Sequence, residues 1–68
     1  MTPQEIGRRL KQLREERGQS KMFVARKLGM PYSTYCSYEY GIRSPNDRAK
    51  IQIAEHFGLT VGELFFAE

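Results

Sequence analysis

The sequence predicts an all-α fold, a compact bundle of five short helices that forms a single domain over residues 1–68. Apolar residues recur every three or four positions, capping residues precede these stretches, and glycines follow most of them. No stretch alternates between apolar and polar residues for long enough to form a convincing strand. A chain of this length buries only about 60% of its unfolded surface, so its core must be small.

The first helix is predicted from the capping box Thr2-Pro3-Gln4-Glu5, in which threonine and glutamate satisfy free backbone amides. Gly18 ends this helix. The buried face of this helix is predicted to carry Ile6, Leu10 and Leu13.

The last two helices have similar signals. Asn46 caps the fourth helix, with Asp47 near its positive end, and Gly58 ends it. Thr60-Val61-Gly62-Glu63 is a second capping box and starts the fifth helix. The side chains expected to face inward are Ala49, Ile53, Ala54, Phe57, Val61, Leu64 and Phe65.

Two short helices lie between these ends. Ser20 caps the second helix, which runs to about Leu28, and the third runs from about Pro31 to Tyr40. Gly41 stops the third helix, and residues 42–45 form a loop.

Ala25 and Gly29 make this pair of helices a candidate helix-turn-helix over residues 21–40. Helices that cross steeply need a small residue at the crossing, which Ala25 supplies. Gly29 adopts the left-handed backbone conformation of a tight reversal at little cost. The second helix of such a motif enters the DNA major groove.

The chain resembles the phage repressor/Cro-like (XRE) family of bacterial transcription regulators over nearly its whole length. The resemblance rests on Ile6–Arg14, on Tyr35-Cys36-Ser37-Tyr38-Glu39-Tyr40-Gly41-Ile42-Arg43-Ser44-Pro45, and on Phe57–Phe65. It implies the five-helix lambda-repressor-like DNA-binding fold and a repressor that acts by occupying its operator. The partner is then double-stranded DNA.

Five side chains of the third helix lie away from the face that carries Tyr35 and Tyr38: Tyr32, Ser33, Thr34, Cys36 and Ser37. The resemblance places the family's base-reading positions at Tyr32, Ser33 and Ser37, with Thr34 and Cys36 as further candidates. Cys36 could alternatively be a redox sensor, but an unreactive surface thiol is favoured because no Lys or Arg is its helical neighbour.

Candidates for phosphate binding lie near helix starts or in the loop after the third helix: Ser20, Lys21, Tyr40, Arg43 and Asn46. The family usually carries glutamine at the position of Lys21, and lysine suits a phosphate better than bidentate reading of adenine. The resemblance also pairs Arg14 with Glu39 as a structural ion pair.

Charge is unevenly distributed along the chain. The formal net charge is +3, all 11 Lys and Arg lie in residues 1–50, and residues 51–68 contain Glu55, Glu63 and Glu68 without a basic residue. A basic first half is typical of a protein that binds a polyanion, although solvated helix faces explain such charges as well.

Other function classes have little support. The single histidine, His56, has no Cys or His at ligand spacing, and no phosphate loop or catalytic triad is visible, so we expect no enzyme activity, metal, cofactor or small-molecule ligand. No apolar run approaches the roughly 20 residues of a membrane span. The lone cysteine fits a reducing cytoplasm, here that of a bacterial or phage-infected cell.

We expect a homodimer, assembled in solution or only on DNA, that binds a palindromic operator. Phe66 is its candidate contact, because Phe65 faces inward and Phe66 lies about 100° away around the helix. The alternative functions are a small protein-interaction module, with its four closely spaced tyrosines as the contact surface, or an antitoxin that binds both DNA and protein.

Overall fold

The computed structural model describes residues 2–66, which form five α-helices and no strand. The helices are α1 (Pro3–Glu16), α2 (Lys21–Leu28), α3 (Tyr32–Glu39), α4 (Asp47–Phe57) and α5 (Val61–Phe65). The predicted all-α class is confirmed, and the helix bounds differ from the predicted ones by one or two residues.

The predicted caps start four of the five helices. Thr2 and Thr60 each form a complete capping box with the glutamate three residues later. The side chains of Ser20 and Asn46 likewise accept hydrogen bonds from the backbone amides three residues later, in α2 and α4. Helix α3 begins after Pro31 and has no side-chain cap.

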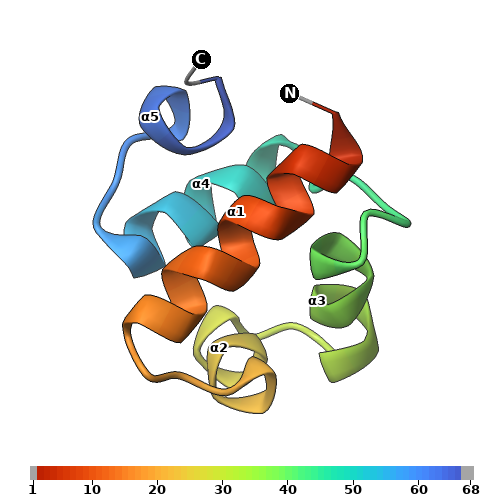
Figure 1. The fold of residues 1–68 in the computed structure, drawn as a ribbon. Helices are drawn as coiled ribbons and strands as arrows, with labels where there is room; N and C mark the ends of the chain where they lie inside the picture. The colour runs from red at the N-terminus through yellow and green to blue at the C-terminus, as the bar shows by residue number, and fades with distance from the viewer. Residues whose placement is uncertain (1, 67–68) are drawn as a thin grey trace.

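The helices pack around one core, with α1 across the middle of the molecule (Figure 1). Helix α1 contacts α3, α3 contacts α2, α2 contacts α4, and α4 contacts α5. The largest side chains that are completely buried are Tyr35, Phe65, Leu10, Ile53, Leu64 and Val24. Leu13, Met30 and Val61 are only partly buried and border this core.

Candidate nucleic-acid interface

The reversal between α2 and α3 has the geometry that its sequence predicts. Ala25, at 2% exposure, lies where α2 meets the core, and the amide of Met30 donates to its carbonyl oxygen at 3.1 Å. Gly29 has φ 68° and ψ 31°, the left-handed conformation that ends a helix. The chain therefore turns directly from α2 into α3.

Helix α3 has a buried side and an open side. Its buried residues are Tyr35, Cys36, Tyr38 and Glu39. At about 100° per residue, Ser33, Ser37 and Tyr40 fall on the opposite side of the helix. The open side is polar and carries hydroxyl groups along its length. Hydroxyl groups can form hydrogen bonds with base edges and with phosphate oxygens.

The prediction that Cys36 is a surface residue available to bases is wrong, because its exposed fraction is only 8%. Helix α3 contacts both α1 and α2, so its buried arc is wider than the stripe through Tyr35 and Tyr38. The Cys36 thiol instead interacts with the Tyr32 hydroxyl, and hydrogen bonding between the two groups raises the pKa of Tyr32. Tyr32 therefore stays neutral at physiological pH.

The other base-reading candidates differ in their exposure to solvent and in their hydrogen bonds within the protein. Tyr32, at 46% exposure, and Ser33 are exposed in the first turn of α3. Thr34 and Ser37 are half-buried, and the Ser37 hydroxyl donates to the carbonyl oxygen of Thr34 at 2.6 Å. Among these four candidates, the exposed ones are therefore at the N-terminal end of α3.

The five phosphate candidates lie at helix starts, at the end of α3 or in the loop after it. Ser20 and Asn46 are exposed and cap α2 and α4, and Arg43 is exposed in the loop after α3. The ammonium group of Lys21 donates to the Tyr40 hydroxyl at 3.0 Å and lies 4.6 Å from the centre of its ring. This hydrogen bond raises the pKa of Lys21, so the lysine is fully charged at neutral pH.

An ion pair fixes α3 to α1. The guanidinium group of Arg14 donates through Nε to Glu39 Oε2 at 2.7 Å and through Nη2 to Glu39 Oε1 at 3.2 Å. Its Nη1 donates to the carbonyl oxygen of Gln19 at 2.8 Å, which also ties down the loop before α2. The structure thus brings together the two residues that the resemblance paired, with side chains only 10% and 1% exposed.

The sequence interpretation missed Gly7, which lies in the middle of α1 where that helix meets the end of α3. A Cβ atom built on Gly7 would lie 2.7 Å from the carbonyl oxygen of Tyr38 and closer still to that of Glu39. Only glycine allows this approach. An isolated glycine inside a helical pattern was the available signal.

His56 also has a role that the sequence did not indicate. Its Nε2 lies 2.9 Å from Oε1 of Gln19, which links the end of α4 to the loop between α1 and α2. Burial lowers the pKa of His56, and the nearby positive charges of Arg17 and Lys27 lower it further.

Across residues 2–66, no group of three His, Cys, Asp or Glu side chains could hold a metal ion. No helix among these residues is long and apolar enough to cross a membrane.

Comparison with known proteins identifies the family. The model of the helix-turn-helix domain family matches residues 5–65. The chain belongs to this helix-turn-helix family. One relative is the HTH-type transcriptional regulator AnsR of Bacillus subtilis (strain 168), with 38% identity over 60 residues, which are 88% of this chain and 52% of the relative. The chain thus spans about half the length of that curated relative, and no solved structure matches it significantly.

Proposed function

We propose that this helix-turn-helix protein binds double-stranded DNA and regulates transcription, with α3 in the major groove. The observation that carries the proposal is the exposed first turn of α3, where Tyr32 and Ser33 present hydroxyl groups, together with the charged Lys21–Tyr40 pair and the exposed Arg43. The similarity to a transcriptional regulator supports it.

In this arrangement the first turn of α3 contacts base edges, and the bordering groups contact the sugar-phosphate backbone. Occupancy of the operator would exclude RNA polymerase, which makes repression the expected outcome.

The test is binding to a labelled random-sequence duplex at low salt, followed by selection of preferred sequences. Ser33→Ala should change the preferred bases and cost about 5- to 150-fold in affinity for the selected site. Gln12→Ala, on the outer side of α1, is the matched control and should leave preference unchanged. An absence of binding to any duplex would reject the proposal.

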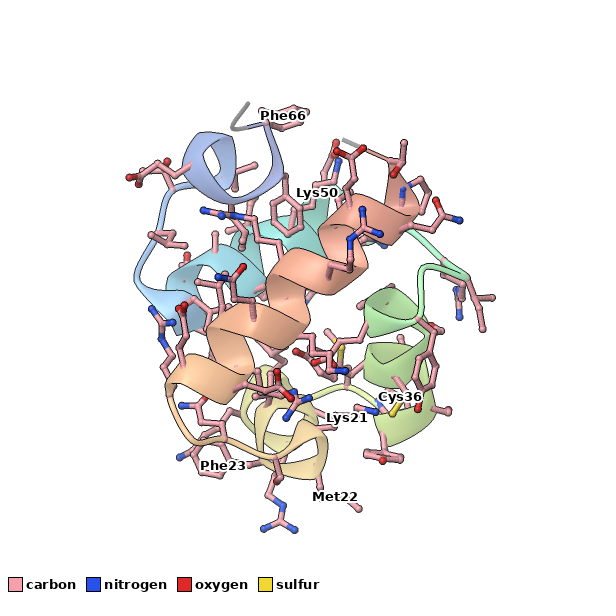
Figure 2. The ribbon with its side chains drawn as sticks, viewed as in Figure 1. Lys21, Met22, Phe23, Cys36, Lys50 and Phe66 are labelled. Carbon is pink, nitrogen blue, oxygen red and sulfur yellow. The ribbon has the colours of Figure 1, made fainter. Side chains whose placement is uncertain are left out.

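We further propose that the protein occupies a palindromic operator as a homodimer. The longest dimension of the described chain is 28 Å, whereas half-sites on one side of the duplex repeat at about 34 Å, so one copy covers one half-site. Phe66, 64% exposed and 5.2 Å from the Lys50 ammonium group, is the candidate contact (Figure 2). Sedimentation of the operator complex should give two proteins per duplex, and Phe66→Ser should reduce this to one or weaken the second binding step.

A protein-interaction module is the second candidate, because Met22 and Phe23 at the start of α2 are about half-exposed apolar side chains (Figure 2). The same duplex experiment separates the two functions. A module of this kind, unlike a DNA-binding regulator, would show little binding to DNA at low salt.

A further inference from the structure

We infer that the groove between α2 and α4 is a docking site for an acidic segment of a partner protein, which inserts an aromatic or large aliphatic side chain beside Phe23. The groove has a volume of about 390 Å³ and is lined by Lys27, Leu28, Gln52, Glu55 and His56. The inference does not depend on the proposed DNA binding. It concerns a different side of the molecule from α3.

Phe23 provides apolar surface next to the groove. Its side chain is 41% exposed, and the centre of its ring lies 6.5 Å from that of His56, which lines the groove from α4. Lys27, one helical turn after Phe23, also lines the groove, and its ammonium group lies 5.6 Å from the centre of the Phe23 ring. The neighbouring Met22 is 51% exposed (Figure 2). Aromatic residues and methionine are enriched in protein interfaces.

The groove also has a positive charge that the protein itself does not neutralise. Burial lowers the pKa of His56, and the charges of Arg17 and Lys27 lower it further, so both charges that act on this groove residue are positive. Arg17 donates hydrogen bonds to backbone carbonyl oxygens, which carry no net charge. Within residues 2–66, neither Arg17 nor Lys27 forms an ion pair, and Glu55 is the one carboxylate of the lining.

These features favour an acidic protein segment as the occupant. Carboxylates beside an apolar side chain would pair with Arg17 and Lys27 and remove the Phe23 ring from water in one contact. A duplex backbone would leave that ring in water and would place its phosphates against Glu55. The volume is at the small end of the range for ligand pockets, which suits one or two inserted side chains.

The groove lies on the side of α2 that faces away from α3. Lys21 contacts Tyr40 at the end of α3, and Phe23, two residues after Lys21, is displaced from it by about 200° around the helix. Phe23 instead lies near His56 of α4. Figure 2 shows Phe23 and Lys21 extending from α2 in different directions. One copy can therefore hold a duplex on α3 and a partner segment in the groove.

Selection from a random peptide library displayed on phage, with the immobilised chain as target, tests the docking site. We expect the enriched peptides to be rich in aspartate and glutamate around one aromatic or large aliphatic residue. Their fluorescein-labelled synthetic forms should bind Phe23→Gln about tenfold or more weakly than the wild type, and Lys27→Glu about three- to tenfold more weakly. Salt should weaken binding to the wild type, because Arg17 and Lys27 are exposed.

Two matched variants provide the controls. Ile42→Ser removes an apolar side chain, 75% exposed, from the loop after α3, and Arg8→Glu reverses a charge near Glu5 at the start of α1. Both should bind the selected peptides within about twofold of the wild type. Thermal melts check the fold of each variant. Lys27 lies outside the core, so Lys27→Glu remains a valid test if Phe23→Gln lowers the Tm.

Amide chemical shifts locate the bound peptide. Titration of isotope-labelled protein should shift the amides of Lys27, Gln52 and His56 and leave those in the first turn of α3 unchanged. No enrichment, enrichment of basic peptides, full binding to both groove variants, or shifts confined to α3 would each overturn the docking site. Duplex binding that is lost with Phe23→Gln and kept with Ile42→Ser would show that the groove holds nucleic acid, and would overturn it as well.

Discussion

Replacing Glu39 with glutamine should remove much of the stability of this protein. The change keeps the size of the side chain but leaves the Arg14 guanidinium group, 10% exposed, without its carboxylate. Breaking a buried ion pair in this way costs about 3–5 kcal/mol. A domain of 68 residues has a total stability of roughly 3–10 kcal/mol. The loss therefore corresponds to a fall in Tm of about 12–40 °C.

Arg14→Met should cost at least as much, because it also removes the 2.8 Å hydrogen bond to the carbonyl oxygen of Gln19. The double variant, which has neither buried charge, should be more stable than the sum of the two single effects predicts. The measurements are thermal and urea unfolding followed by far-ultraviolet circular dichroism. High salt should change these differences little, because buried charges are poorly screened.

Gln12→Ala is the control for this series. Gln12 forms an exposed side-chain bond to Glu16 at 3.4 Å, and its loss should change stability by less than about 0.5 kcal/mol. Additive effects of Arg14→Met and Glu39→Gln, within about 0.5 kcal/mol, would refute the reasoning, because residues that do not interact behave that way.

Three further predictions concern Gly7, Cys36 and His56. Gly7→Ala should destabilise the protein by about 1–3 kcal/mol in urea unfolding, because the added methyl group meets the carbonyl oxygen of Glu39. This loss is expected although alanine is a better helix former than glycine by about 1 kcal/mol. A gain in stability would contradict the close approach of α1 to α3. Cys36 should react slowly with a thiol reagent in the native protein and rapidly in urea, whereas equal rates would show that the thiol is accessible. Lowering the pH from about 7.5 to 5 should reduce stability, because the pKa of His56 is lowered in the folded state and the unfolded chain therefore binds the proton more strongly. His56→Gln should make stability depend less on pH over this range. An unchanged pH dependence in this variant would exclude His56 as its source.

The helices could be predicted because their signals are local. Thr2, Ser20, Asn46 and Thr60 cap the helices that follow them, and their hydrogen bonds involve residues only three positions away. The left-handed turn at Gly29 is equally local. Such features depend on the chain's own backbone and need no knowledge of tertiary packing.

The interface was harder to predict because it depends on contacts between distant segments. Burial of Cys36 follows from the way α1 and α2 both contact α3, which widens the buried arc. The link between Lys21 and Tyr40 spans 19 residues, and periodicity within one helix does not predict it. Arg14 and Glu39 are 25 residues apart, and only the family resemblance paired them.

These long-range contacts matter most for α3, which has little stability of its own. It is eight residues long and lacks a side-chain cap, and isolated helices of this length are marginal in water. Its position is set by the Arg14–Glu39 pair, by the approach of α1 at Gly7 and by the buried Tyr35 ring. The direction in which the open side of α3 faces is therefore set in part by α1, which packs against the buried side of α3. Substitutions at Gly7 or Arg14 should consequently weaken DNA binding even at temperatures where the variant remains folded, without removing any group that touches DNA.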